Sequence, residues 1–294
     1  MKKWISMIAA VAIMTTGLAA CGSKTNSNKM ITVVSREDGS GTRTAFIELF
    51  GLQEKAADGT KVDKTTKEAL IANKTDVMLT QVAGNEFAIG YLSMGSLNDT
   101  IKAVNIDGVA PTVENVKNGT YKISRPFLIA VKKDAAGGDK EKLQKDFINF
   151  ILSADGQKVI EDNLYIKVQD SASAFQGTKP SGKLVVGGSS SVTPVMEKLK
   201  EAYATVNPNA TIEVQQSDSS TGLKSGIDGT IDIAMSSRDL TEDEKTKLQE
   251  TKIATDGIAV IVNKANPVSD LKKTDVSKIF SGGAATWADI SSNS

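Results

Sequence analysis

Short apolar runs rich in β-branched residues alternate with helical patterns from about residue 30 onwards. Runs of this length and composition predict buried strands. Strands that alternate with helices favour an α/β fold with mainly parallel sheets. The predicted strands are Ile31–Val34, Ala88–Leu92, Phe127–Val131, Lys183–Val186, Thr211–Gln215, Ile231–Met235 and Gly257–Asn263.

Three segments between these runs have the pattern of amphipathic helices. Thr193-Pro194 is typical of a helix start, because Pro is favoured at the first helical position, and apolar residues then recur at 3.6-residue spacing. Thr241–Glu244 has the residues of a capping box and predicts a second helix, which we expect to end near Glu250. Residues 147–152 give a third apolar face.

The first 28 residues have a different pattern. A basic start followed by a short apolar run predicts an export signal, because a spanning helix needs about 20 apolar residues. The segment Leu18–Cys21 resembles the lipobox of bacterial lipoproteins, and Cys21 is the only cysteine of the chain. We therefore expect residues 1–20 to be a signal peptide, Cys21 to carry the lipid, and residues 21–28 to form a flexible tether.

The composition narrows the possible chemistry. A chain of 294 residues with 40% hydrophobic content can form one or two domains with a sizeable core. Lys and Arg together number 35, as do Asp and Glu, so the overall charge gives no reason to expect nucleic acid as a partner. The absence of histidine excludes Ser-His-Asp and Cys-His triads and histidine-based zinc sites. We expect neither a metal nor a cofactor, while Ser-Lys and carboxylate catalysis stay open.

Three loops rich in glycine and hydroxyl side chains each lie between a predicted strand and a predicted helix. They are Arg36–Thr42, Gly187–Pro194 and Ser217–Leu223. Backbone N–H groups at a helix start lack intrahelical partners and attract anions. One such loop alone is more often a capped turn, but three of them, with Arg36 and Arg43 beside one, favour a site for a small oxyanion. The chain has no Walker A, GxGxxG or GxSxG pattern in these loops.

The order and residues of these loops resemble the PstS family, the phosphate-binding proteins of ABC importers. The segment REDGSGT at residues 36–42 is similar to the family's R-x-D-G-S-G-T loop. GGSSSVTP, SDSSTGL and DIAMSS, at residues 187–194, 217–223 and 232–237, resemble three more of its segments. The resemblance covers nearly all of the chain after the tether. It implies an α/β periplasmic-binding-protein fold of two lobes, each with a mixed, mainly parallel sheet, and a two-crossing hinge.

The family's common order differs from the order in this chain. The GGSSS-type loop commonly lies near the mature N-terminus and the R-x-D-G-S-G-T loop about midway, whereas here the latter comes first. Residues 286–290 resemble the segment that normally leads into it. The resemblance therefore implies a circular permutation, with residues 169–182 joining the usual termini and the chain complete at Ser294.

Permutation changes the expected domain boundaries. The Ser-, Gly- and Ala-rich composition of residues 169–182 alone predicts a boundary between two domains there. The resemblance instead implies lobe B at residues 29–120 plus 256–294 and lobe A at residues 121–255. The hinge crossings are then expected near Tyr121–Arg125 and Ala254–Ile258.

The resemblance also implies roles for individual residues. Arg36 is expected to donate to phosphate, with Asp38 orienting it, and Ser237 stands where many members have an acidic residue that accepts the ligand's proton. Nearby acids are Asp218 and Asp239. Arg238 contacts either the ligand or Asp239 at the surface. The expected phosphate-binding residues are Arg36, Asp38, Ser40, Gly41, Thr42, Ser190, Ser191, Ser219 and Ser237, with Ser189, Arg43, Arg238 and Asp239 as possible additions.

The function implied is capture of inorganic phosphate by a monomeric lipoprotein on the extracytoplasmic face of the cell membrane, with delivery to the permease subunits of an ABC importer. Other tetrahedral oxyanions, namely sulfate, molybdate and arsenate, are alternatives. A serine hydrolase or phosphatase that pairs a loop serine with a lysine base is a less favoured one. A phosphate sensor or adhesin without transport is a further alternative.

Overall fold

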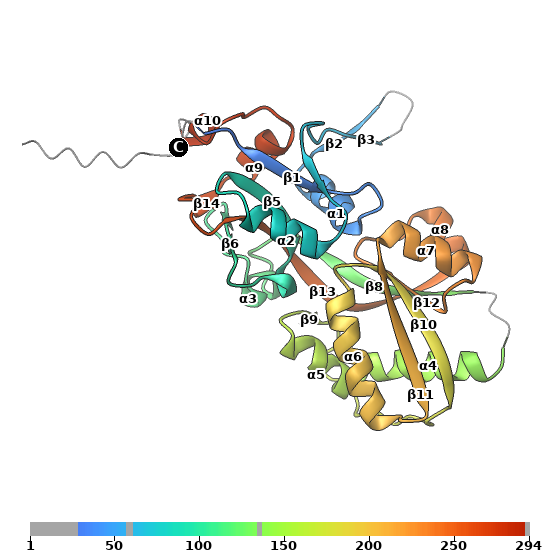
Figure 1. The fold of residues 1–294 in the computed structure, drawn as a ribbon. Coiled ribbons are helices and arrows are strands. Elements are labelled where there is room, and N and C mark those ends of the chain that lie inside the picture. The colour runs from blue at the N-terminus through green and yellow to red at the C-terminus, as the bar shows by residue number, and fades with distance from the viewer. Residues whose placement is uncertain (1–28, 57–60, 134–136, 292–294) are drawn as a thin grey trace, which may run out of the picture.

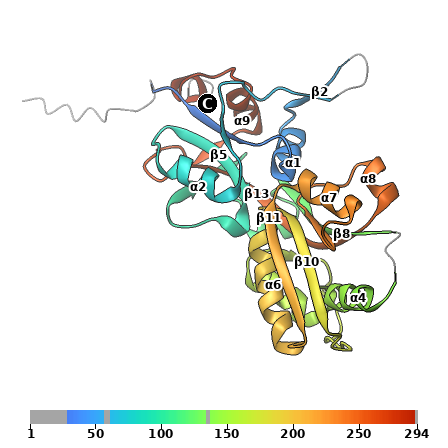
Figure 2. The ribbon, with the colours of Figure 1, turned by 45° about the vertical axis from the view of Figure 1, so that its right-hand side comes forward.

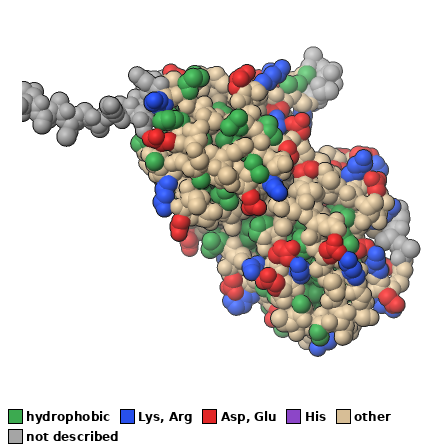
Figure 3. Space-filling model, viewed as in Figure 1, with side chains coloured by type: hydrophobic (Ala, Val, Ile, Leu, Met, Phe, Trp, Pro, Cys, Tyr) green, Lys and Arg blue, Asp and Glu red, His purple; other side chains and the backbone are tan. Residues whose placement is uncertain are grey.

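The computed structural model describes residues 29–56, 61–133 and 137–291. The predicted signal peptide, Cys21 and the tether lie outside these residues. Two lobes are joined by long strands that pass between them, so the expected two-lobe α/β fold is confirmed (Figure 1). Acidic and basic side chains are interspersed over the face shown in Figure 3.

The lobe that contains β1 is built from segments at both ends of the chain (Figure 1). Its elements before the crossing are β1 (Thr32–Arg36), α1 (Gly41–Leu49), β2 (Gln53–Lys55), β3 (Lys61–Asp63), β4 (Leu70–Ala72), α2 (Thr75–Ala83), β5 (Ala88–Ser93), the 3₁₀ turn η2 (Met94–Ser96), β6 (Ile101–Ala103), β7 (Asn105–Ile106) and α3 (Val113–Lys117). Its last elements are β14 (Asp270–Leu271), α9 (Lys273–Phe280) and α10 (Ala288–Ser291).

The other lobe is formed by the middle of the chain. Its elements are α4 (Asp139–Leu152), α5 (Ala154–Asp162), β9 (Ile166–Lys167), β10 (Gly182–Ser189), α6 (Thr193–Val206), β11 (Ala210–Ser217), α7 (Ser219–Asp228), β12 (Ile233–Ser236) and α8 (Glu242–Lys247). The two strands that cross between the lobes are β8 (Ser124–Lys132) and β13 (Leu248–Asn263).

The sheet is continuous through both lobes, in the order β11-β10-β12-β8-β13-β5-β1-β4, with β6 and β9 also paired to β13. Parallel pairing joins β10 to β11 and β12, and β1 to β4 and β5. The described antiparallel pairs of this sheet all include β8 or β13. The sheet is therefore mixed, as expected. It has fewer parallel pairs than the expected mainly parallel sheets, because the two crossing strands run antiparallel to the strands on either side.

Each lobe has its own hydrophobic core. One core includes buried residues from 33 to 123 and from 258 to 290, and α1, α2, α3 and α9 contribute to it. The other includes residues from 127 to 254, with α4, α5 and α6 against one face of the strands. A smaller cluster packs α7 against the opposite face. Figure 2 shows α6 and α7 on different sides of β10.

The predicted strands all occur, and six of them lie within three residues of their predicted bounds, whereas the strand predicted at Gly257–Asn263 already begins at Leu248. The helix at Thr193 and the capping box at Thr241 are also present. The expected end of the latter helix near Glu250 is wrong, because Leu248 already pairs with Lys132 as the first residue of β13. No helix among the described residues combines the length and apolar character that crossing a bilayer requires.

Residues 169–182 lie against α4 and α6 and are held by side chains. Asp146 accepts hydrogen bonds from the backbone N–H and hydroxyl of Thr178, at 2.8 and 3.3 Å. The ring of Phe175 packs edge-on against Phe150, with 5.3 Å between centroids. This segment is a surface element of the lobe that contains α4.

Candidate anion-binding site

The candidate site lies where the carboxyl ends of strands from both lobes meet. In one lobe, β1 ends at Arg36 and leads through a short loop into α1. In the other, β10 leads into α6 and β11 into α7, and β12 ends at Ser236. The starts of three helices, with their unpaired N–H groups, therefore surround one region.

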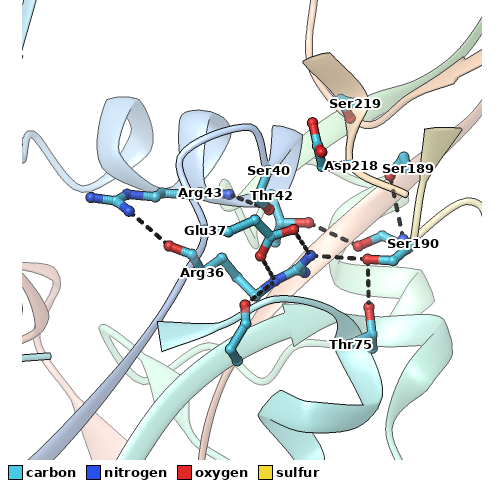
Figure 4. Close-up of polar contacts among 12 residues, drawn as sticks. Arg36, Glu37, Ser40, Thr42, Arg43, Thr75, Ser189, Ser190, Asp218 and Ser219 are labelled. Carbon is cyan, nitrogen blue, oxygen red and sulfur yellow. Dashed lines mark hydrogen bonds and ion pairs between the residues drawn. The ribbon is translucent and has the colours of Figure 1, made fainter. Parts of the chain in front are cut away.

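Arg36 is the central cation of this region and is 1% exposed. Its Nε and Nη2 donate to the two carboxylate oxygens of Glu37, each at 2.8 Å. Nε also donates to the carbonyl of Ala72 at 3.1 Å, and Nη2 donates to Ser190 Oγ in the other lobe at 2.9 Å. Figure 4 shows the guanidinium between Glu37 and Ser190. These contacts fix its orientation.

One nitrogen of the same guanidinium has no partner in the part of the protein that the structure describes. Among the described residues, Arg36 Nη1 is buried and makes no hydrogen bond. A buried charged donor without an acceptor costs several times more than an ordinary hydrogen bond contributes. An oxyanion beside Nη1 would supply the acceptor, so the donor set fits a small anion.

Hydroxyl groups surround this cation. Thr42 Oγ1 and Ser191 Oγ lie 2.8 Å apart across the lobes. Ser189 Oγ donates to Ser237 Oγ at 2.9 Å, and Ser219 Oγ lies 3.4 Å from the same atom. All five side chains are buried. Hydroxyls both donate and accept, so this cluster can bind oxyanions in more than one protonation state.

Two glycines allow the lobes to approach closely. A Cβ on Gly41 would lie 2.8 Å from Ser237 Oγ and would overlap Ser219, and a Cβ on Gly39 would overlap the carboxylate of Asp218. The backbone N–H of Ser220 donates to the carbonyl of Gly39 at 3.2 Å. A Cβ at Gly41 would therefore force the serines of the other lobe to shift, and one at Gly39 would displace the Asp218 carboxylate. Ser40 serves as N-cap of α1, accepting from Arg43 N at 3.3 Å.

Asp38 does not orient Arg36, contrary to expectation. Its side chain is 98% exposed and pairs with Arg43 at 2.7 Å. Arg43 also pairs with Asp63 and donates to the Arg36 carbonyl, each at 2.8 Å. Burial raises the pKa of Asp63, but hydrogen bonds from Thr65 and the charge of Arg43 outweigh it and lower that pKa. Arg43 thus stabilises the loop between β1 and α1 through contacts with Asp38, Asp63 and the Arg36 carbonyl.

Among the described residues, the ion-pair partner of Arg238 is Glu244 and not the carboxylate of Asp239. It is 9% exposed and makes a two-pronged ion pair with Glu244, both distances being 2.9 Å. Its Nη2 also donates to Ser220 Oγ at 3.2 Å. Asp239 is exposed and contributes its backbone carbonyl. Burial raises the pKa of Glu244, but Arg238 and Thr241 more than compensate and lower it.

Ser237 stands where many family members have an acidic residue, and among the described residues no carboxylate hydrogen-bonds to its side chain. Asp218 is the N-cap of α7, accepting from Thr221 N at 2.8 Å and from the Thr221 hydroxyl at 2.6 Å. Its carboxylate is therefore committed to the helix start. Ser237 Oγ itself meets the serines at 189 and 219.

Three residues of this site were not predicted from the sequence. Glu37 takes the place expected for Asp38, and Thr75 Oγ1 lies 3.4 Å from Ser190 Oγ at the start of α2. The Tyr91 hydroxyl accepts from the Arg36 N–H at 3.2 Å, and burial raises its pKa. Because Glu37 is adjacent to Arg36 in the sequence, an ion pair between them could have been predicted. Thr75 and Tyr91 are distant from the loop in sequence and contact the site only in the folded protein.

A buried ion pair lies behind the site, on the crossing strands. Arg125 of β8 and Asp256 of β13 are 3.0 Å apart, both about 1% exposed in their side chains. Ser93 donates to Asp256 at 2.8 Å, and Arg125 Nη1 lies 3.5 Å from the carbonyl of Ser237. Burial raises the pKa of Asp256, although Arg125 opposes the shift. The crossing strands β8 and β13 are thereby connected to Ser237, directly after β12.

Other chemistry finds little support in the described parts of the chain. They contain no group of three or more His, Cys, Asp or Glu residues that could hold a metal ion. The site serines bond to one another, to Arg36 and to threonines, and no lysine donates to Ser190 or Ser191 among these residues. The structure thus offers donors for an anion and no lysine base beside these serines.

Comparisons with known proteins agree with this geometry. A PBP superfamily domain matches residues 2–155 and 173–294. Phosphate-binding protein PstS 2 of Streptococcus agalactiae is 52% identical over 293 residues, which are 98% of each chain. The crystal structure of a phosphate ABC transporter, phosphate-binding protein from Streptococcus pneumoniae is 43% identical, with 89% of this chain and 99% of that chain covered and a TM-score of 0.69.

A more distant relative matches only in part. Phosphate-binding protein PstS of Staphylococcus haemolyticus is 42% identical over 114 residues, 36% of each chain. All these names describe binding proteins and not enzymes. The high identity along nearly the whole length of the streptococcal relative and the two-lobe fold agree, and the chain belongs to the PstS family of phosphate-binding proteins within the PBP superfamily.

Proposed function

We propose that this protein captures inorganic phosphate between its two lobes and delivers it to the permease subunits of an ABC importer. The observation that carries the proposal is Arg36 Nη1, a buried charged donor that finds no acceptor among the described residues and is surrounded by hydroxyls from both lobes. The names of the streptococcal relatives support phosphate as the ligand and an ABC transporter as the partner.

Binding and lobe closure are one event in this proposal. Phosphate accepts from Arg36, from the loop of Ser40, Gly41 and Thr42, and from the serines of the other lobe. Both donor sets meet only when the lobes are together, so the ligand favours that arrangement. The serines proposed as ligand-binding residues on that side are Ser189, Ser190, Ser191, Ser219 and Ser237.

The lobes retain the boundaries given above in this proposal, with residues 169–182 joining the family's usual termini. Two observations support the permutation. The chain enters β1 beside its other end, where Met30 bridges Thr286 and Ile31 N donates to the Ala285 carbonyl at 2.8 Å. The match to the staphylococcal relative covers about a third of each chain, as expected when one segment of a reordered chain aligns.

The protein acts at the extracytoplasmic face of the cell membrane in this proposal, as a monomer held by a lipid on Cys21. The residue pattern before Cys21 supports the anchor. Replacing Cys21 with serine in the producing bacterium should release the protein from the membrane fraction. Retention of Cys21→Ser on membranes would contradict lipid anchoring at this residue.

The test of binding is isothermal titration of the purified, ligand-free protein with phosphate and then with sulfate. We expect saturable phosphate binding, weakened about 10- to 100-fold in Arg36→Met because a charge-assisted hydrogen bond is lost. Lys61→Gln, which removes a cation from an exposed pair with Glu48, is the matched control. Equal binding of both anions would replace phosphate with oxyanions in general, and no binding of either would overturn the proposal.

A further inference from the structure

We propose that Glu37 determines the anion selectivity of this site by neutralising Arg36. The inference rests on the proposed function and names the residue that does the work of the acid missing at Ser237. The carboxylate of Glu37 covers the Nε and Nη2 edge of the guanidinium and leaves Nη1 for the ligand.

The charge balance around the site supports this role. The chain contains four arginines, at positions 36, 43, 125 and 238. Each makes an ion pair with a carboxylate, respectively with Glu37, with Asp38 and Asp63, with Asp256, and with Glu244. No arginine therefore brings an uncompensated positive charge to the ligand. Within the described ranges, the other side-chain donors that surround Arg36 are uncharged hydroxyls.

Glu37 is well placed for this balance. Its side chain is only 19% exposed, against 2% for the Arg36 side chain. Both of its oxygens lie 2.8 Å from nitrogens of Arg36. At such distances and with little water between them, the two charges cancel more completely than they would at the surface. The ligand accordingly meets a nearly neutral site.

A nearly neutral buried site discriminates by ligand charge. A fully ionised dianion such as sulfate loses its hydration and gains little Coulomb energy there. The phosphate monoanion carries one negative charge fewer than sulfate, and both the monoanion and the dianion of phosphate retain a proton that can be donated to a hydroxyl such as Ser237 Oγ. Sulfate cannot donate. In many family members a carboxylate accepts the ligand's proton directly. In this protein, the neutralisation of Arg36 by Glu37 takes over that role in selectivity.

The test compares phosphate and sulfate affinities by titration in the wild type and in Glu37→Gln. Removing the carboxylate restores a positive charge, and the Coulomb gain grows with ligand charge, so at a pH below the second ionisation of phosphate the sulfate dianion gains more than the phosphate monoanion. We expect the phosphate-to-sulfate affinity ratio to fall by about tenfold. Glu37→Ser makes the same charge change with a smaller side chain and should also lower the ratio. Agreement between the two variants shows that the effect comes from the charge and not from packing.

Two further variants separate the possible causes. Glu37→Asp retains the charge with poorer geometry, so both affinities should fall while the ratio is kept. Glu48→Gln removes one exposed carboxylate of α1 and should leave the ratio unchanged. If the wild type is selective and its phosphate-to-sulfate affinity ratio is unchanged in Glu37→Gln and Glu37→Ser, the inference is overturned. The same holds if the ratio falls equally in Glu48→Gln. A wild type that binds no phosphate would instead overturn the proposed function.

Discussion

Thr42 Oγ1 and Ser191 Oγ lie 2.8 Å apart, although the two residues are 149 positions apart in the chain. The first belongs to the start of α1 and the second to the loop before α6, so the pair joins the two lobes beside the candidate site. Ser190, the neighbour of Ser191, accepts from Arg36 of the first lobe. Lobe contact and ligand donors are thus supplied by the same loops.

Replacing Thr42 with valine should weaken phosphate binding. The change keeps the shape of the side chain and removes one hydroxyl, whose hydrogen bond is worth about 0.5–1.5 kcal/mol, so the affinity should fall about 2- to 13-fold. Titration calorimetry measures the change. Thr205→Val, which removes an exposed hydroxyl near the end of α6, serves as control. An unaltered affinity in Thr42→Val would show that this hydroxyl contributes nothing to binding.

Replacing Gly41 with alanine should keep the lobes apart. The added Cβ would overlap Ser219 and crowd Ser237, both on the other lobe. We expect a phosphate affinity more than about tenfold weaker, since the lost arrangement supplies several donors, and a larger radius of gyration by X-ray scattering. In Gly137→Ala the new Cβ meets only the flexible end of Glu141, so binding should persist. Normal binding by Gly41→Ala would refute the close approach.

Glu244→Gln should destabilise the protein in a pH-dependent manner. The folded-state pKa of Glu244 is lowered, so its carboxylate contributes stability above its unfolded pKa of about 4.3 and loses it as the pH falls through the folded value. At pH 7 we expect a loss of about 1–3 kcal/mol in the free energy of unfolding.

Urea denaturation at pH 7 and near pH 3 measures this difference, which should shrink at the lower pH. Glu242→Gln, which alters an exposed pair with Lys245, is the matched control and should change nothing measurable. A loss in Glu244→Gln that is the same at both pH values would exclude the ion pair with Arg238 as its cause.

Asp256→Asn should be more damaging, because it leaves the charge of Arg125 buried without a partner. Removing one member of a buried pair typically costs about 3–5 kcal/mol. The double change Arg125→Met with Asp256→Leu removes both charges and should recover part of that loss, as chemical denaturation would reveal. If the double variant were less stable than Asp256→Asn, hydrogen bonds such as the one from Ser93 would matter more than the charge.

Sequence patterns located the strands and loops because burial on both faces produces long β-branched runs and glycine-rich turns. They failed where a neighbour in space decided the outcome. Pairing with β8 ends α8 at Lys247, although the local sequence continues to favour a helix. Tertiary contacts override local preference in such cases.

The role expected for Asp38 belongs to Glu37, for which the sequence predicted no role, and the reason is similar. Both carboxylates follow Arg36 closely, and the backbone at the end of β1 decides which one turns inward. A resemblance to the family's R-x-D-G-S-G-T loop favours Asp38, while the fold gives Asp38 to Arg43. The partner of Arg238 was likewise invisible, because Glu244 reaches it only through the placement of α8.

β13 spans residues 248–263 and pairs with β8 and β9 in one lobe and with β5 and β6 in the other. Neither lobe can lose this strand without exposing the polar backbone of its own central sheet. Local melting in one lobe therefore removes ordered structure from both. The protein should denature as one cooperative unit, with a single transition instead of one for each lobe.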